Sequence, residues 1–244
     1  MAKMYSYEDV FLDTKRSLFV MAHPDDADVF FGGTISRLIE DKKEVFVLVV
    51  TNGCRGCREN DINEEELAII RIEEQRQSLN IYGVPGSHFS VLNYKDGEAE
   101  NNMELIGKIA YVIRKFKPDI VCTHNPNGYF SKISKENRYF VNHRDHRICG
   151  ISTLDAVYPF SRDKNFFIEH ANEGLQTHNV HKILLTSTPE QTNTIIDIKQ
   201  DIMLKKKDGL AKHKSQFNSQ SIEEIVKFFT SENGFIERGF FINL

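Results

Sequence analysis

The stretch SLFVMAHPDDADVFFGGTISRL, residues 17–38, decides the fold that the sequence predicts. Its first six residues, SLFVMA, are almost all apolar, which is typical of a buried strand. The polar turn HPDD follows, and residues 31–41 read as a helix that ends at the polar DKK. A strand, a polar turn and a helix in this order indicate the first unit of a parallel α/β sheet.

The same alternation continues along the chain. Further strands are expected at 45–50, 88–92, 120–123 and 183–186. Further helices are expected at 64–82, 104–116, 147–157, 194–207 and 222–230. Residues 124–142 form a long polar loop, and no repeat or linker divides the chain. We therefore expect one domain over residues 1–244: a Rossmann-like α/β three-layer sandwich with a mostly parallel sheet and a site at the carboxyl ends of its strands.

Composition narrows the class of protein. The chain has 244 residues, of which 40% are hydrophobic and 27% charged, as in an ordinary soluble protein. Its formal net charge of -4 argues against a nucleic-acid partner, which usually requires a basic excess. No segment approaches the roughly 20 apolar residues of a membrane span, and the start MAKMYSYEDV lacks an apolar signal core. These features predict a cytoplasmic protein with no membrane partner.

The cysteines are expected to be free thiols in such a protein. The pair Cys54 and Cys57, in CRGC, has the spacing of a zinc knuckle or of a redox pair. A structural zinc site needs two more ligands at similar spacing, and none are present in the sequence. A packed or solvated thiol pair is the favoured interpretation, and a metal or redox role stays the alternative.

The acidic turn after the first strand has two interpretations. His23, Asp25 and Asp26 lie where ligands bind in open parallel sheets, beyond the carboxyl end of a strand. An aspartate here could instead cap the following helix, but one would suffice for that purpose. Three aspartates within four residues repel one another unless a cation is present. Asp28 is left as the candidate cap, and the others are candidate metal ligands.

A second cluster, NHRDHR at 142–147, follows the expected fourth strand and its long loop. If a helix starts here, His143 and His146 lie three residues apart on one face, and Asp145 could orient an imidazole. A solvated histidine pair is the alternative interpretation. Two clusters that converge on one sheet edge argue against it. A His/Asp/His set suits zinc with a fourth position open for water. Zinc lowers the pKa of such a water to about 7, so the sequence points to metal-assisted hydrolysis.

These motifs resemble those of a known family, the PIG-L/LmbE-like zinc-dependent de-N-acetylases. HPDD with GGT is similar to the family's first motif, and NHRDHR to its second. Further stretches agree in order, so that the resemblance spans roughly residues 17–217: TNGCRG, LAIIRIEE, LNYKDGE, YPFSRD and AKHKSQ. LNYKDGE and KHKSQF are most similar to the diacetylchitobiose and N-acetylglucosamine deacetylase branch.

The resemblance implies an enzyme that removes the N-acetyl group from an N-acetylglucosamine-type sugar or glycoconjugate. The implied zinc ligands are His23, Asp26 and His146. Asp25 would be the general base that activates water. His143, held by Asp145, would stabilise the oxyanion and help to protonate the departing amine.

The resemblance also suggests how the sugar is bound. Arg71 and Asp96 match positions that hold sugar hydroxyls in relatives, and His213 matches a residue near that pocket. Each could instead be an ordinary helix or turn residue. Relatives often form trimers or hexamers, so a homo-oligomer is expected.

The loop at 128–141 supplies candidate stacking residues for the sugar, which could equally pack against the sheet: Tyr129, Phe130, Tyr139 and Phe140. Two positions depart from the family pattern. Ala27 stands where a glutamate is common, and Arg144 replaces a usual proline, which adds positive charge beside the site. Arg144 could favour an acidic substrate substituent, although a solvent-facing role is the preferred interpretation.

Two other functions remain open. The chain could be a catalytically silent sugar-binding or regulatory protein, although the Asp25 carboxylate beside ligand-like His23 and Asp26 argues against this. A zinc amidase or esterase that acts on a non-acetyl group would use the same residues.

Overall fold

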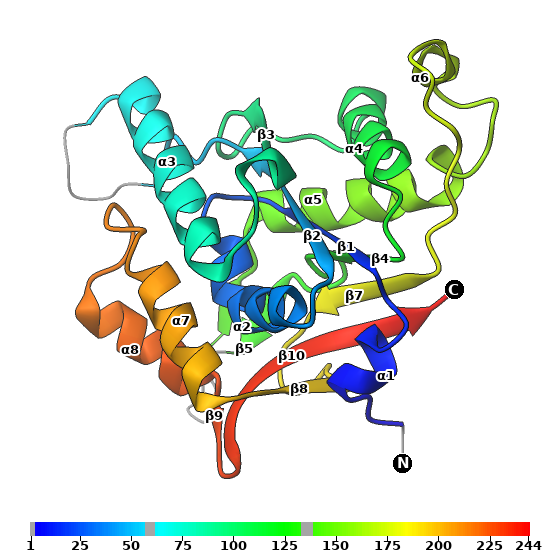
Figure 1. The fold of residues 1–244 in the computed structure, drawn as a ribbon. Coiled ribbons are helices and arrows are strands. Elements are labelled where there is room, and N and C mark those ends of the chain that lie inside the picture. Colours follow the sequence, from blue (N-terminus) through cyan, green and yellow to red (C-terminus); the bar gives the residue numbers. More distant parts are fainter. Residues whose placement is uncertain (1–2, 57–61, 133–138) are drawn as a thin grey trace.

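The centre of the protein is an eight-stranded mixed sheet (Figure 1). The computed structural model describes residues 3–56, 62–132 and 139–244. The strands of the sheet are β1 (Arg16–Met21), β2 (Glu44–Thr51), β3 (Phe89–Tyr94), β4 (Ile120–Thr123), β7 (Lys182–Thr186), β8 (Thr194–Ile198), β9 (Thr230–Ser231) and β10 (Gly234–Asn243). Their order is β3-β2-β1-β4-β7-β10-β8, with β9 paired to β10.

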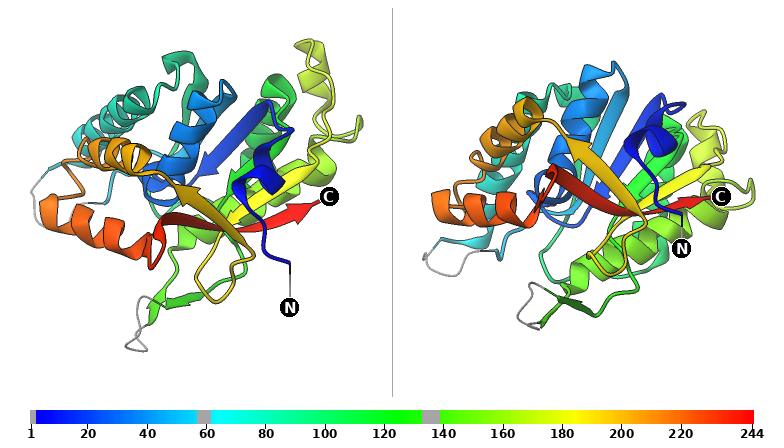
Figure 2. Two further views of the ribbon diagram at one scale, coloured as in Figure 1. Left: turned by 60° about the horizontal axis from the view of Figure 1, so that its bottom comes forward. Right: turned by 90° about the horizontal axis from the view of Figure 1, so that it is seen from below.

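Helices connect the strands and cover both faces of the sheet (Figure 2). The α-helices are α1 (Tyr7–Phe11), α2 (Asp26–Glu40), α3 (Glu64–Tyr82), α4 (Met103–Phe116), α5 (Arg144–Asp155), α6 (Ile168–Asn172), α7 (Gln200–Leu210) and α8 (Ser219–Phe228). Helices α2, α3, α7 and α8 lie on one face, and α4, α5 and α6 on the other. This arrangement confirms the predicted three-layer α/β fold.

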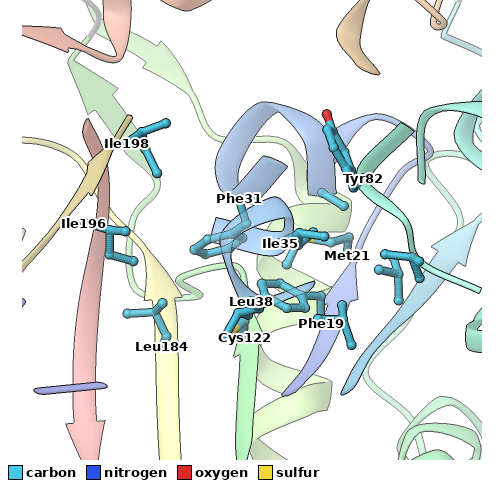
Figure 3. Close-up of a cluster of buried hydrophobic side chains, with 14 of the residues drawn as sticks. Phe19, Met21, Phe31, Ile35, Leu38, Tyr82, Cys122, Leu184, Ile196 and Ile198 are labelled. Atoms are coloured by element: carbon cyan, nitrogen blue, oxygen red, sulfur yellow. The ribbon is translucent and has the colours of Figure 1, made fainter. Parts of the chain in front are cut away.

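The core follows from the alternation of side chains along the strands. In β1, Phe19 and Met21 point to the face covered by α2, whereas Leu18 and Val20 point to the face covered by α4 and α5. Strands buried on both faces need continuous apolar sequence, which explains the run in β1 and in β2. Figure 3 shows part of the first cluster, in which Phe31 of α2 lies near side chains of the sheet.

The parallel part of the sheet creates a natural ligand site. Strands β3, β2, β1, β4 and β7 pair in parallel. From β1 the chain first builds outward through β2 and β3, and it then returns to place β4 on the other side of β1. The connections after β1 and β4 therefore diverge, and a crevice at their carboxyl ends is the usual ligand position.

Several expected elements were placed wrongly. Residues 194–207 were expected to be one helix, but Thr194, Ile196 and Ile198 are buried in alternation with exposed residues, and β8 occupies this segment before α7 begins. Helix α2 begins at Asp26 rather than at Phe31. Strand β10 was not anticipated, and it pairs antiparallel with both β7 and β8.

The polar loop after β4 contains a short hairpin, which the sequence did not predict. It consists of β5 (Phe130–Lys132) and β6 (Tyr139–Val141). The side chains of Tyr129 and Phe130 are about two-thirds exposed, at 64% and 66%, so neither packs against the sheet. The side chains of Tyr139 and Phe140 lie outside the part that the structure describes.

Two further sequence expectations concern cysteines and membranes. Cys54, Cys122 and Cys149 are buried free thiols, as expected, while Cys57 lies outside the described residues, so the CRGC pair stays a hypothesis. Among the helices in the described ranges, none combines the length and the apolar character needed to cross a bilayer.

Candidate metal centre and active site

The segments that follow the parallel strands β1, β3 and β4 meet at the crevice beside β1 and β4. The HPDD turn leaves β1 and leads into α2, and Asp96 follows β3. His124 comes directly after β4, and His143 and His146 lie at the start of α5. The candidate residues from both sequence clusters are therefore brought to one edge of the sheet, as the sequence predicted.

Three of these side chains form a group that could hold a metal ion: His23, Asp26 and His146. Their donor atoms lie within 4.8 Å of one another. The His23 Nδ1 atom is 3.3 Å from His146 Nε2, and this Nε2 atom is 3.2 Å from Asp26 Oδ1. Two imidazoles and one carboxylate form a donor set that suits zinc with an open coordination position.

The surrounding hydrogen bonds prepare these nitrogens to bind a cation. Asn142 Oδ1 lies 3.2 Å from His146 Nδ1, and Asp145 Oδ2 lies 3.3 Å from His23 Nε2. Both oxygens are acceptors, so each favours the tautomer with its proton on that nitrogen. The lone pairs of His23 Nδ1 and His146 Nε2 then face each other, which is unfavourable unless a proton or a metal cation lies between them. The residues therefore fit a divalent metal.

His124 is a member of this cluster that the sequence analysis did not single out. Its buried ring stacks on His146 with ring centroids 4.1 Å apart, and its Nε2 atom accepts the Ala22 N–H at 3.1 Å. Burial lowers the pKa of His124 to about 4, which keeps the ring neutral. The sequence feature that could have identified His124 as a site residue is its position directly after a parallel strand.

Asp26 is the most strongly anchored carboxylate of the group. Its Oδ2 atom accepts the backbone N–H of His23 at 2.8 Å. Burial raises the pKa of Asp26, but the neighbouring His146 ring outweighs this effect and holds the pKa well below its usual range. Asp26 is thus kept ionised, as a metal ligand requires.

Asp25 lies beside the metal group in an unusual backbone conformation. Its φ is 118°, in the left-handed region that residues with a Cβ atom rarely occupy. Its carboxylate accepts a hydrogen bond from Arg71 Nη2 at 3.0 Å. Burial raises the pKa of Asp25, while the Arg71 charge opposes this increase. Asp25 is therefore a restrained carboxylate at the pocket wall.

Arg71 stabilises the HPDD turn. It also lines the pocket, as expected for a candidate substrate-binding residue. Its guanidinium donates to the carbonyls of Pro24 at 2.9 Å and Gly53 at 2.8 Å. A Cβ atom at Gly53 or Gly56 would lie 2.6 Å or 2.1 Å from Arg71 Nη1. The two glycines of TNGCRG thus leave the space that the guanidinium occupies.

His143 and Asp145 are adjacent, but their arrangement differs from the expected one. The Asp145 carboxylate accepts the Gly97 N–H at 2.6 Å and faces His23, and its Oδ2 atom lies 4.0 Å from His143 Nδ1. The His143 Nδ1 atom instead accepts the backbone N–H of Asp145 at 3.2 Å. Neutral His143 therefore carries its proton on Nε2, 4.0 Å from Asp96 Oδ1.

Two residues lie elsewhere than the sequence suggested. His213 is fully buried, with Nε2 3.2 Å from Asp28 Oδ2, and it is not part of the pocket wall. Asp28 does not cap α2; it is fully buried and accepts hydrogen bonds from Gln75 and Tyr82 of α3. The cap expectation was wrong because α2 begins at Asp26, so that Asp28 lies inside the first turn and points toward α3.

The site opens into a pocket of about 580 Å³. Its wall consists of His23, Asp25, Asp26, Arg55, Gly56, Arg71, Asp96, Gly97, His143, His146 and Gln216. Arg55 and Gln216 were not predicted as site residues, although they belong to the quoted stretches TNGCRG and AKHKSQ. Arg144 lies outside this wall and donates to the Gly97 and Ala99 carbonyls, which ties the start of α5 to the loop after β3.

Comparison with known proteins places this site in a family. Residues 18–157 match the family model described as PIG-L, GlcNAc-PI de-N-acetylase. A diacetylchitobiose deacetylase of Thermococcus kodakarensis is 31% identical over 213 residues, which cover 87% of this chain and 74% of the relative. The chain belongs to the PIG-L family. The family match includes both His/Asp clusters and extends from within β1 to beyond the end of α5.

Other relatives show how far the similarity extends. A 1D-myo-inositol 2-acetamido-2-deoxy-alpha-D-glucopyranoside deacetylase of Segniliparus rotundus is 30% identical over 172 residues, and the aligned part is 59% of this chain. The chain spans about half of that relative, 51%. N,N'-diacetylchitobiose deacetylase from Pyrococcus horikoshii superposes with a TM-score of 0.83 at 29% identity, over 97% of this chain and 87% of its own.

More distant structures share the fold alone. The 4-carboxy-2-hydroxymuconate hydratase GalB of a Pseudomonas has a TM-score of 0.71 at 17% identity, over 94% of this chain and 96% of its own. A hydratase on the same fold shows that the fold does not decide the reaction, so the function has to be argued from the site.

Proposed function

We propose that the protein is a zinc-dependent hydrolase that removes the N-acetyl group from an N-acetylglucosamine-type sugar. The observation that carries this proposal is the group of His23, Asp26 and His146 with the Asp25 carboxylate beside it, at the edge of an open pocket. The 31% identity to a diacetylchitobiose deacetylase over most of the chain supports the same conclusion.

The three ligands would hold the ion, and the residues behind them would orient the ligands. Asn142 and Asp145 orient the two imidazoles, and His124 neighbours the Asp26 carboxylate. A zinc ion bound here supplies Lewis acidity, which makes water more acidic and polarises an amide carbonyl. The identity of the metal is part of the proposal, because the nitrogen and oxygen donor set suits zinc but also other transition metals.

Asp25 would take the proton from the attacking water. It is not among the three metal-ligand candidates, and it lines the pocket. Burial raises the pKa of its carboxyl, and a carboxylate with a raised pKa is a stronger base. Arg71 holds one carboxylate oxygen, so the orientation of the base is restrained.

His143 would stabilise the developing negative charge on the carbonyl oxygen. Its Nδ1 atom is occupied by the Asp145 backbone N–H, so Nε2 carries the available proton. Burial lowers the pKa of His143, and the nearby His23 and His146 lower it further. A neutral ring with a hydrogen-bond donor on the pocket side suits an oxyanion.

The pocket would bind the sugar through polar groups. Asp96 and Gln216 line it and offer acceptor and donor atoms for sugar hydroxyls, and Arg55 lies at the same wall. We infer diacetylchitobiose or a related N-acetylglucosamine compound as the substrate, because the aligned relative with 87% coverage is named for that sugar. The proposed catalytic unit is a single domain that comprises residues 1–244.

The test is to measure acetate release from a panel of N-acetylglucosamine compounds, with the metal content quantified in parallel. The proposal predicts acetate release, loss of activity after chelation and its recovery when zinc is restored. Formyl and bulkier acyl analogues form a second arm, and preferential cleavage of these would favour a different amidase or esterase. Zinc binding without hydrolysis of any amide would instead indicate a silent sugar-binding protein.

Oligomeric state remains a prediction from the family resemblance. A trimer or hexamer is expected, and light scattering on the purified chain would measure its mass in solution. A monomer at micromolar concentration would contradict this expectation.

A further inference from the structure

The Asp25 backbone needs support beyond its own helix. Its φ of 118° lies in a region where the Cβ atom makes unfavourable contacts, and such a conformation persists only when its surroundings enforce it. Arg71 holds the carboxylate and the preceding carbonyl of Pro24. Neither of these contacts fixes the Asp25 N–H, whose direction changes with φ.

That N–H is bound by Gln75 of α3. The Gln75 side chain is fully buried, and its Oε1 atom accepts the Asp25 N–H at 2.8 Å. Its Nε2 atom donates to Asp28 Oδ2 at 2.6 Å. The amide orientation follows from the chemistry of its partners, because a backbone N–H only donates and a carboxylate only accepts. The Gln75 amide can therefore bridge Asp25 and Asp28 in one orientation only.

The far end of this bridge is firmly anchored. Asp28 is fully buried and also accepts hydrogen bonds from Ser78 and from Tyr82, the latter at 2.7 Å. His213 Nε2 lies 3.2 Å from Asp28 Oδ2, the same oxygen that Gln75 contacts. None of Asp28, Gln75 and His213 is part of the described pocket wall, and Gln75 itself reaches the site through the Asp25 N–H.

We propose that Gln75 is a positioning residue for the proposed base: it holds the Asp25 backbone in its left-handed conformation and ties it to the buried Asp28 network. The inference rests on the proposed function for the role of Asp25. Arg71 and Gln75 then divide the task, since Arg71 orients the carboxylate and Gln75 fixes the main chain that carries it. Loss of either contact would misplace the base without removing it.

Isosteric substitution gives the sharpest test. Gln75→Glu retains an acceptor for the Asp25 N–H but places a second carboxylate against Asp28, which disrupts the bridge. Combining it with Asp28→Asn restores a donor opposite the new acceptor. Gln75→Met has a similar volume and no polar end, so it tests the same contact without added charge. The matched control is Gln77→Glu, because Gln77 is exposed on the same helix and donates to Glu73 at 3.2 Å.

Crystal structures and kinetics of these variants report on the proposal separately. For Gln75→Glu and Gln75→Met we expect the Asp25 φ to leave the left-handed region and kcat to fall about 10- to 100-fold, with KM changed by less than about threefold. The double variant should recover most of the lost kcat, and the Gln77→Glu control should match the wild type. Far-ultraviolet circular dichroism and metal content identify variants that fail to fold or to bind metal.

Two results would overturn the proposal. One is an unchanged Asp25 φ in the Gln75→Met crystal structure, which decides the matter whether or not the wild type hydrolyses any substrate tested. The other is a wild-type kcat in both single variants of an active enzyme. An inactive wild type whose Asp25 relaxes in Gln75→Met would refute the proposed function but retain the positioning role.

Discussion

Buried charged side chains lie both at the first turn of α2 and against its middle, but they are neutralised in different ways. In the middle, Glu237 of β10 accepts the N–H groups of Gly33 and Thr34, each at 2.8 Å. Lys206 of α7 donates to Glu237 at 2.6 Å and to the Val29 carbonyl at 2.8 Å, and the pair is fully buried. The two buried charges that pack against the middle of α2 thus neutralise each other within the chain.

At the start of α2, Arg71 pairs with Asp25 and the α3 network holds Asp28, whereas among the described residues only histidine rings pair with Asp26. Asp26 is surrounded by the rings of His23, His124 and His146, and two ring nitrogens face each other at 3.3 Å. One side of this group is open to the pocket. A buried charge cluster that the chain itself satisfies is structural, whereas one that still needs a cation is a candidate site. This contrast supports the metal proposal independently of the family comparison.

The largest expected effect is at the first turn. Asp25→Asn should lower kcat by about 10²–10⁴-fold, because an amide cannot take a proton from water. Metal content should stay at the wild-type level, since the three ligand candidates are unchanged. Steady-state kinetics with metal analysis would check this, and near-normal turnover would show that another group is the base.

A substitution beside the middle of α2 should instead lower the stability of the protein. Glu237→Gln leaves Lys206 as a buried charge without a counter-charge, so the free energy of unfolding should fall by about 3–5 kcal/mol. Urea denaturation measures the change. The control is Glu223→Gln, which breaks the exposed ion pair with Lys207 and should cost less than about 1 kcal/mol. Equal decreases in the free energy of unfolding would show that the buried pair matters no more for stability than the exposed pair.

Close packing in the same region gives a smaller effect. A Cβ atom at Gly33 would lie 2.8 Å from Ile198 Cδ1 and 3.1 Å from Glu237 Oε1. Gly33→Ala should therefore destabilise the protein by about 1–3 kcal/mol. Gly86→Ala, where no atom lies within 4 Å of the added group, should change stability by about 0.5 kcal/mol or less. A neutral Gly33→Ala would mean that β8 and β10 can move away from α2.

Much of the fold and of the metal group could be predicted because their signals are local. The apolar runs of β1 and β2 and the dense charges of HPDD and NHRDHR are each visible within a few residues. The rule that parallel strands end at one edge then brings His23 and His146 together. The signals were weaker near the end of the chain: TIIDI of β8 was misassigned because its alternation is short and adjoins a real helix, and β10 was not anticipated.

The supporting residues could not be predicted because their partners are distant in sequence. Gln75 bridges Asp25 and Asp28 across about 50 positions, and Glu237 reaches Gly33 across 204. A lone glutamine on a helix carries no signal of this kind. His124 was missed for a related reason, since a single histidine at the start of a polar loop resembles a solvated residue.

The most direct test of the account is a crystal structure of the zinc-loaded protein with anomalous diffraction measured on both sides of the zinc absorption edge. We expect one strong peak bonded to His23 Nδ1, Asp26 and His146 Nε2, at about 2.0–2.2 Å from each ligand atom. A peak at another set of residues, or none in protein that hydrolyses N-acetylglucosamine compounds, would contradict it.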